Sequence, residues 1–355
     1  MKVLNGSRLS IHIKYFIFIS IIKSLLLSQN QDFESFAKEQ DSLWQSFSQK
    51  IDQQWEEFKV SNVDSKVDYN KDYTARSEIN FRYRYLEIEA IVSETDPNQF
   101  VTANRLIGDR LSTIFDIKDQ AGNKILAGLL MNKFTGNTLR AKEQGDYLKQ
   151  MKSRITESEP SYQADDGAHR RKYSLKIPFT PKYLQILINY YLIYVKKYAS
   201  QYNIDPQLVL AIIHHESSFN PWANNKKSNA SGLMQLVPKT GALDAYNHVF
   251  KTFWTPSREY LEDPEKNIQL GVAYLDLLEN KYFKEIKDPI KKLYVTIAAY
   301  NWGPTNVRKK IVSPVKINEI TQNELFKRIK KLSPASTGEY LSNVISEIEY
   351  YNRYF

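Results

Sequence analysis

Residues 205–221, DPQLVLAIIHHESSFNP, decide the character of the second half of the chain, because they place one carboxylate at the end of an apolar helix. Asp205 can cap the free N–H groups of a first helical turn, and Pro206 fits that turn without losing an internal hydrogen bond. The residues that recur three and four positions apart, and so share one helix face, are Val209, Ile212, Ile213 and Glu216. The stretch therefore predicts a helix whose core-facing stripe ends in an acid.

An acid on such a stripe is expected to be desolvated. Desolvation disfavours the charged form, so we expect the pKa of Glu216 to rise toward neutrality. A carboxyl that keeps its proton there can act as a general acid toward a departing oxygen. The other interpretation is a partly exposed glutamate at a helix end with no chemical role.

Two more helices are expected to start in the same way. DPEKNIQLGVAYLDLL begins at Asp263 and DPIKKLYVTIAAYN begins at Asp288, each with an Asp-Pro pair. They follow a long apolar segment at 180–202, TPKYLQILINYYLIYVKKYASQY, and strand patterns are scarce among these segments. Residues 176–355 are therefore predicted to form an all-α domain.

Residues 31–175 predict a small α+β domain, so the chain is α+β overall. An amphipathic helix is expected over 33–59, with an apolar stripe made of Phe33, Phe36, Leu43, Trp44, Phe47, Ile51, Trp55 and Phe58. Residues 77–92 alternate apolar and polar side chains with a phase slip of one residue, which predicts two strands or one bulged strand. A helix is expected near 98–115, and 140–172 is polar and poorly patterned.

The N-terminus resembles a secretory leader. Residues 1–14 are basic and residues 15–22, YFIFISII, are apolar, but Lys23 interrupts the run. Residues 1–30 are predicted to be a signal peptide or an uncleaved signal anchor, and the protein is expected to be exported. The chain has no Cys, which excludes disulfides, thiolate metal sites, a Cys nucleophile and a lipidated Cys.

The net charge of +9 suggests an anionic partner such as nucleic acid, anionic membrane or an acidic wall polymer. Residues 1–31 hold four basic residues and no acid, so without them the net charge is 9 − 4 = +5. No nucleic-acid recognition motif occurs. His214 and His215 are adjacent and cannot form an i, i+4 metal pair, and no metal or other cofactor is expected.

Two further stretches supply polar side chains suited to sugar binding. NASGLMQLVP at 229–238 holds a glycine turn, Met234 and Gln235, and a glutamine can both donate to and accept from an N-acetyl group. IAAYNWGP at 297–304 ends a helix and presents Tyr300, Asn301 and Trp302 together. The combination of three such stretches in this order is far more specific than any one of them.

With these stretches the chain resembles the lytic transglycosylases of the soluble-lytic-transglycosylase superfamily. HESSFNP, ASGLMQLVP, AAYNWG and TGEYLSNV match the successive motifs of that family. The resemblance is closest to the membrane-bound murein transglycosylase C group, through 255–283 and 333–341, and KDYTARSEINF at 71–81 is similar to the N-terminal domain of that group. The likeness runs from about residue 33 to the end.

The resemblance implies a goose-lysozyme-like catalytic domain that acts on peptidoglycan glycan strands. It also implies a periplasmic location in a Gram-negative-type bacterium, with possible membrane association through the N-terminal segment. Glu216 would be the sole acid and base. The implied substrate-binding residues are Ser217, Met234, Gln235, Tyr300, Asn301 and Tyr340. Two residues depart from the family pattern, since Trp302 follows the Ala-Tyr-Asn and Lys226 stands near the place of a common serine.

The expected reaction rests on the family resemblance together with the absence of a second acid at a motif position, because a two-carboxylate glycosidase needs one. Glu216 would cleave the β-1,4 bond between N-acetylmuramic acid and N-acetylglucosamine, and the C6 hydroxyl of the muramic acid would close a 1,6-anhydro ring. Two alternatives remain open: a lysozyme-like hydrolase that uses water, and an inactive wall-binding protein.

Overall fold

The computed structural model describes residues 38–39, 42, 45–118, 122, 124–126, 128–151, 155–157 and 161–355. The chain divides into two compact units, one of Met1–Phe58 with Tyr162–Ala168 and the other of Lys59–Ser161 with His169–Phe355. The predicted leader at 1–30 lies outside the described residues. Among the residues that are described, no helix has the length and apolar character needed to cross a membrane.

The smaller unit contains part of the helix that was predicted over 33–59. It is helical over 45–52, and Gln54 N donates to Ile51 O in a tightened last turn, so the helix ends earlier than expected. Ile51 and Trp55 are both buried as predicted, although Trp55 lies in the following loop. Of the predicted stripe, Phe33, Phe36, Leu43 and Trp44 lie outside the described residues. β5 (Tyr162–Gln163) also belongs to this unit, and Tyr162 Oη donates to Gln54 O at 2.7 Å.

The larger unit begins with an antiparallel sheet. Its strands are β1 (Ser65–Tyr69), β2 (Ala75–Asn80), β3 (Tyr85–Ser93), β4 (Thr156–Glu157) and β6 (His169–Pro178). Among the described residues of this unit their order is β1-β2-β3-β6-β4. The phase slip in 77–92 is a turn between two strands, with Asn80 paired to Tyr85, so the two-strand interpretation is confirmed.

β6 was not predicted, and it crosses the polar segment 140–172 and the expected domain boundary at 175. Its buried residues Tyr173, Leu175 and Ile177 alternate with polar ones, as expected for a strand with one face on the core. The basic stretch His169–Lys172 conceals this alternation at its start.

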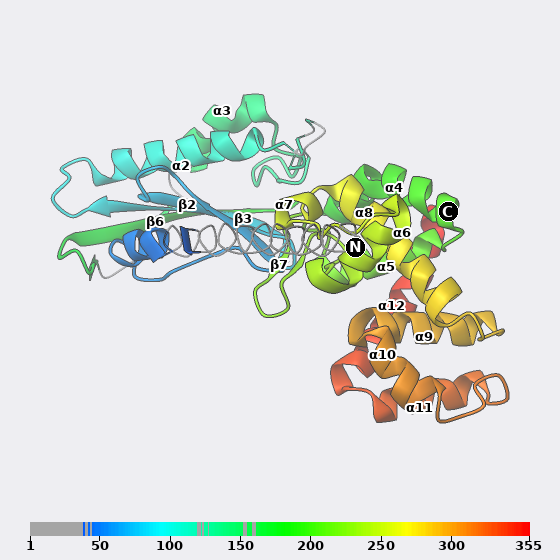
Figure 1. The fold of residues 1–355 in the computed structure, drawn as a ribbon. Helices are drawn as coiled ribbons and strands as arrows, with labels where there is room; N and C mark the ends of the chain where they lie inside the picture. The colour runs from blue at the N-terminus through cyan, green and yellow to red at the C-terminus, as the bar shows by residue number, and fades with distance from the viewer. Residues whose placement is uncertain are drawn as a thin grey trace, which may run out of the picture. The chain divides into compact units, whose positions relative to one another are not determined.

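One face of the sheet packs against a helix (Figure 1). α2 (Gln99–Phe115), predicted near 98–115, turns its apolar side to β2 and β3, and α3 (Gln144–Met151) lies beside it. The residues that α2 buries include Ala103, Leu106, Ile107, Leu111 and Ile114. The predicted α+β organisation of the first part is therefore confirmed.

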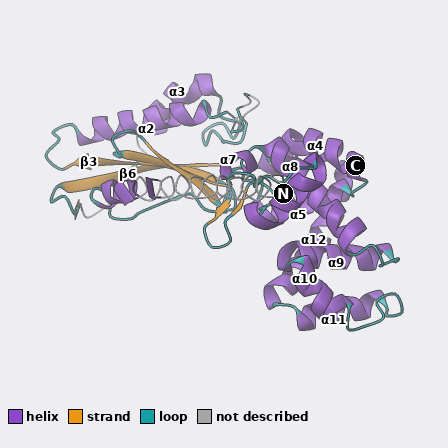
Figure 2. Cartoon of the chain, viewed as in Figure 1, coloured by secondary structure: helices purple, strands orange, loops and turns teal. Residues whose placement is uncertain are grey.

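The part of the larger unit that follows the sheet is mainly helical (Figure 2). Its helices are α4 (Tyr183–Tyr202), α5 (Pro206–Ser217), α6 (Leu243–Phe250), α7 (Arg258–Leu261), α8 (Pro264–Asp276), α9 (Pro289–Trp302), α10 (Pro304–Val307), α11 (Gln322–Leu332) and α12 (Ala335–Tyr351). Shorter 3-10 and π-helical turns are η1 (Ala141–Glu143), η3 (Pro238–Ala242), η4 (Leu277–Tyr282), η5 (Arg308–Val312) and η6 (Asn352–Tyr354). A short hairpin lies between α5 and η3. Its two strands, β7 (Asn224–Asn225) and β8 (Ala230–Ser231), have two residues each.

The three Asp-Pro starts are confirmed. The aspartates accept from backbone N–H groups of the first turns of α5, α8 and α9, in the pairs Asp205–Gln207, Asp263–Lys266 and Asp288–Lys291. In each helix the proline occupies the first turn, where no internal donor is lost.

α5 is the central helix of this part. Residues 208–213 are all almost completely buried, and α5 packs against α4 and α12. A helix that is apolar all round belongs to a core. The apolar stripe of α5 therefore lies in the core, and Glu216 lies at its C-terminal end, where the helix leaves the core.

Candidate active site

Glu216 is half-buried at the end of α5, and no ion pair to it occurs among the described residues. Desolvation by its surroundings raises the pKa of Glu216 to about 7, and the Tyr340 hydroxyl partly offsets that rise. The carboxyl can therefore hold or release a proton near neutrality, which is what a group acting as both acid and base needs.

The chain turns sharply after Glu216. Ser217 is buried and its hydroxyl donates to Ile213 O at 3.0 Å, so it secures the last helical turn. Ser218 and Phe219 both have left-handed backbones, with φ of 52° and 65°. This conformation is uncommon for residues other than glycine, and it ends α5 directly after the acid.

The 229–238 loop is held in place by Asn267 of α8, a residue that the motif pattern did not reveal. Its buried amide donates to Ser231 O and Leu261 O and accepts from Met234 N at 2.8 Å. Gly232 has φ of 79°, and a Cβ there would lie 2.0 Å from Leu261 O. The close approach expected at Gly232 is therefore to the protein's own chain.

Met234 is fully buried, and its Sδ would lie 2.1 Å from a Cβ at Gly271. Its side chain packs in the core, while its carbonyl oxygen accepts from Tyr300 Oη at 2.7 Å. Met234 thus fixes the position of Tyr300.

Gln235 is half-buried with φ of 47°. Its Nε2 donates to Ala223 O at 3.1 Å and to Gly232 O at 3.0 Å. Only the amide nitrogen of Gln235 can donate to these two carbonyl oxygens, so its position is fixed by them. The side-chain carbonyl oxygen of Gln235 then remains available to accept a hydrogen bond from a ligand.

α9 contributes Tyr300 and Asn301 at its C-terminal end. Burial, and secondly the negative charge of Glu216, raise the pKa of the Tyr300 hydroxyl well above its ordinary value. Asn301 is exposed and its Oδ1 accepts from Thr337 Oγ1 of α12 at 2.8 Å. Gln235, Tyr300, Asn301 and Trp302 line a cavity of about 560 Å³.

Tyr340 of α12 completes the surroundings of Glu216. It is 3% exposed, and burial together with the charge of Glu216 raises the pKa of its hydroxyl well above the ordinary value. Its Oη interacts with the carboxyl but has no hydrogen bond of ordinary length and angle among the described residues. The charge of Glu216 therefore raises the pKa of both tyrosine hydroxyls, and of the two only Tyr340 lowers the pKa of Glu216 in return.

The structure also reveals a second carboxyl with a raised pKa that the sequence did not single out. Desolvation raises the pKa of Glu347 to about 7, and its Oε1 lies 3.5 Å from His214 Nδ1. Burial lowers the pKa of His214 to about 4, and its Nδ1 also pairs with Tyr351 Oη at 2.9 Å. Glu347 lies about two helical turns beyond Tyr340 on α12, and its charge contributes to the raised pKa of the Tyr340 hydroxyl.

Lys226, the other departure noted in the sequence, lies in the exposed turn between β7 and β8. The neighbouring Asn225 Oδ1 accepts from Lys227 N and Ser228 N, so Asn225 stabilises that turn.

The chain is similar to known lytic transglycosylases along most of its length. A family model described as "Transglycosylase SLT domain" matches residues 193–322, and one described as "Membrane-bound lytic murein transglycosylase C, N-terminal domain" matches residues 21–108. A protein of Edwardsiella ictaluri (strain 93-146) named "Membrane-bound lytic murein transglycosylase C" is 34% identical over 308 residues, which cover 81% of this chain and 82% of the relative. A protein of the same name from Shigella sonnei (strain Ss046) is 33% identical over 306 residues, with the same two coverages.

A crystal structure of the 70 kDa soluble lytic transglycosylase SLT70 from Escherichia coli is also similar. It shares 26% identity over 48% of this chain and 28% of that chain, with a TM-score of 0.38.

Proposed function

The chain belongs to the membrane-bound lytic murein transglycosylase C family and is a lytic murein transglycosylase, and from this premise we propose how its residues carry out the reaction. The bond cleaved is the β-1,4 bond between N-acetylmuramic acid and N-acetylglucosamine, and the product ends are 1,6-anhydromuramic acid. The observation that carries the proposal is the desolvated Glu216, whose charge is felt by two neutral tyrosines.

In the first step Glu216 acts as the acid. Its proton passes to the bridging oxygen while the bond from that oxygen to C1 of the muramic acid breaks, and N-acetylglucosamine leaves with a free hydroxyl. The 2-acetamido oxygen of the muramic acid stabilises the positive charge that develops at C1. The raised pKa of Glu216 supports this role because the proton is present near neutrality.

In the second step Glu216 acts as the base. The carboxylate takes the proton of the C6 hydroxyl as that oxygen bonds to C1, which closes the anhydro ring and restores the acid. Water takes no part, and a hydroxyl on the same sugar has a large effective concentration compared with a bimolecular nucleophile.

The other residues of the site would hold the substrate. The free carbonyl of Gln235 can accept from an N-acetyl N–H, and exposed Asn301 can bind along the cavity that it lines. Tyr340 would hold the carboxyl in place through its hydroxyl. Ser217, Met234 and Tyr300, whose hydroxyl donates to Met234 O, would support the site through the protein's own hydrogen bonds.

The experiment that tests the proposal is digestion of purified sacculi with mass analysis of the products. The wild type should release muropeptides with anhydro ends, and Glu216→Gln should lower the rate by about 10²–10⁴-fold because the proton transfer is lost. Reducing ends would instead support the hydrolase, and wild-type binding without release would support the wall-binding protein. A Glu216→Gln protein as fast as wild type would overturn the role of Glu216.

We also infer that the protein is exported to the periplasm and associates with the membrane through its N-terminal segment. The basic and apolar pattern of residues 1–30 and the printed name of the relatives support this location. Cell fractionation tests it: deletion of residues 2–30 should leave the protein in the cytoplasm.

The domain division stays a prediction as well, with an N-terminal domain at 31–175 and a catalytic domain at 176–355. Because β6 spans the predicted boundary, limited proteolysis should cleave beyond it, between Pro178 and Tyr183, if the two parts fold separately.

A further inference from the structure

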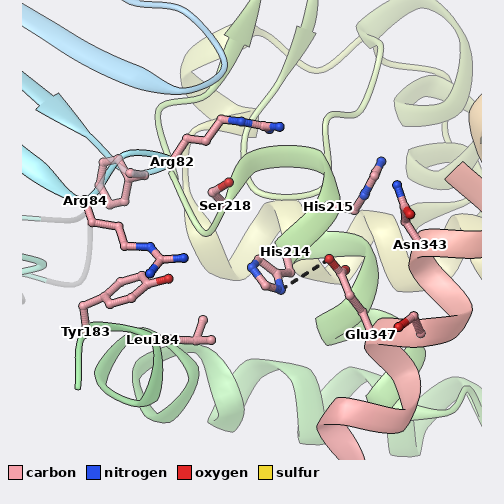
Figure 3. Close-up of a pocket in the computed structure, with 11 residues that line it drawn as sticks. Arg82, Arg84, Tyr183, Leu184, His214, His215, Ser218, Asn343 and Glu347 are labelled. Carbon is pink, nitrogen blue, oxygen red and sulfur yellow. Dashed lines mark ion pairs between the residues drawn. The ribbon is translucent and has the colours of Figure 1, made fainter. Parts of the chain in front are cut away.

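A second hollow, of about 430 Å³, lies beside the end of α5, in the larger unit (Figure 3). The turn between β2 and β3 contributes Arg82 and Arg84 to it, and α5 contributes His214, His215 and Ser218. Tyr183 and Leu184 come from α4, and Asn343, Ser346 and Glu347 come from α12. The mechanism proposed above uses none of these residues.

The charge of this hollow comes from its two arginines. Burial lowers the pKa of His214 to about 4 and also lowers that of His215, so both imidazoles are neutral near pH 7. Glu347 is at most partly ionised there, because burial raises its pKa to about 7. The hollow therefore attracts a negatively charged ligand.

Both guanidinium groups are available to such a ligand. Arg84 has no ion pair among the described residues and lies over the ring of Tyr183, 4.8 Å from its centroid. Arg82 faces Asp64 at 3.8 Å, with both side chains largely exposed, and an exposed pair of this length contributes little. Arg84 also has φ of 63°, an uncommon backbone conformation for an arginine.

Two side chains, His215 and Tyr340, lie between the hollow and the Glu216 carboxyl. His215 lines the hollow, and its ring meets the ring of Tyr340 edge-on with centroids 4.8 Å apart. Tyr340 in turn interacts with the Glu216 carboxyl. A peptide stem, at about 3.3–3.6 Å per residue, is long enough to span these two rings from a sugar bound at Glu216.

We propose that Arg82 and Arg84 bind a carboxylate of the peptide stem carried by the N-acetylmuramic acid at the active site. In peptidoglycan the lactyl groups that bear peptides are amides, so the free carboxylates belong to the stems. Planar guanidinium groups match carboxylates in charge and geometry. The inference rests on the proposed function, because it assumes that murein occupies the cleft at Glu216.

The test measures binding to the Glu216→Gln protein, which leaves the ligand uncleaved. The probes are short glycan strands with intact peptide stems and the same strands after enzymatic removal of the stems. We expect tighter binding of the stem-bearing strands, and we expect Arg82→Gln with Arg84→Gln to reduce that preference at least about fivefold, the loss typical of two partly exposed charge pairs. Arg82→Lys with Arg84→Lys should keep part of it.

Arg140→Gln is the matched control, since Arg140 is an exposed arginine that does not line the hollow. It should leave the preference as it is. An unchanged preference in the double glutamine variant would overturn the inference, and so would an equal loss of affinity for both probes. If the Glu216→Gln protein binds neither probe, the proposed function itself fails, which is a different outcome.

Discussion

Two desolvated glutamates in different parts of the larger unit, buried Glu89 and half-buried Glu216, have pKa values shifted in opposite directions. Glu89 lies on β3 in the sheet, where desolvation would raise its pKa, but a hydrogen bond from Arg76 at 2.7 Å and the charges of Arg76 and Lys59 lower it instead. Glu216 lies at the end of α5, where desolvation acts with only Tyr340 to offset it, so its pKa rises to about 7.

The difference teaches that burial alone does not decide the chemistry of an acid. The cation against Glu89 keeps this carboxylate ionised near neutrality, and the pair links β2 to β3. The absence of a cation against Glu216, among the described residues, leaves it able to exchange a proton. The same substitution, glutamate to glutamine, should therefore have opposite effects on stability at the two positions.

The largest effect is expected at the sheet. Glu89→Gln leaves Arg76, whose side chain is 1% exposed, without its carboxylate, and should destabilise the protein by about 3–5 kcal/mol. Chemical denaturation at pH 8 measures it. Glu143→Gln, which breaks an exposed pair with Arg140, should cost less than about 1 kcal/mol. Equal effects of the two variants would contradict the buried pairing.

The contribution of Glu89 also depends on pH. A depressed folded-state pKa gives stability that is present above the unfolded value of 4.5 and is lost as the pH falls through the folded value. The difference between wild type and Glu89→Gln should therefore shrink in acid.

A smaller effect of opposite sign is expected at the active site. A folded-state pKa of about 7 against 4.5 means that ionised Glu216 lowers stability as the pH rises through this window. Glutamine mimics the protonated acid, so Glu216→Gln should be more stable than wild type by on the order of 2 kcal/mol at pH 8 and nearly equal to it at pH 4. Thermal melts at both pH values measure it.

The control for that comparison is Glu339→Gln, which removes an exposed carboxyl next to Tyr340. It should change stability little at either pH. If Glu216→Gln were less stable than wild type at pH 8, the ionised carboxylate would stabilise the folded protein, which contradicts the raised pKa of Glu216.

The smallest effect concerns the position of the pH–rate profile. Because Tyr340 lowers the pKa of Glu216, Tyr340→Phe should move the alkaline limb of activity upward from about 7. The position of the limb is the measurement, whatever the change in rate. Tyr260→Phe is the control, because Tyr260 lies on α7 and is not among the groups that shift the pKa of Glu216, so it should leave the limb where it is. A shift to lower pH in Tyr340→Phe would contradict the interaction.

Much of the architecture follows from local patterns. The Asp-Pro starts of α5, α8 and α9 depend only on a side chain capping its own first turn, so they can be predicted from neighbouring residues. The break between β2 and β3 follows from alternation. β6 was missed because its core-facing residues begin only after a basic run.

The site divides in the same way. Glu216 could be placed on a core stripe from helical spacing alone. The sequence did not reveal that Met234 packs inward, that Gln235 turns its amide nitrogen to the chain, or that Asn267 holds their loop. Each of these depends on a contact between segments distant along the chain.

By itself, the sequence determined which residues begin helices, which face of α5 is apolar, and which acid ends that face. Only the tertiary structure decided that acid's surroundings: two tyrosines from α9 and α12 instead of a cation, and a pair of arginines from a strand turn near the same helix end. Local patterns act through backbone geometry and neighbouring side chains, whereas a pKa and a binding charge depend on what distant segments bring within a few ångströms.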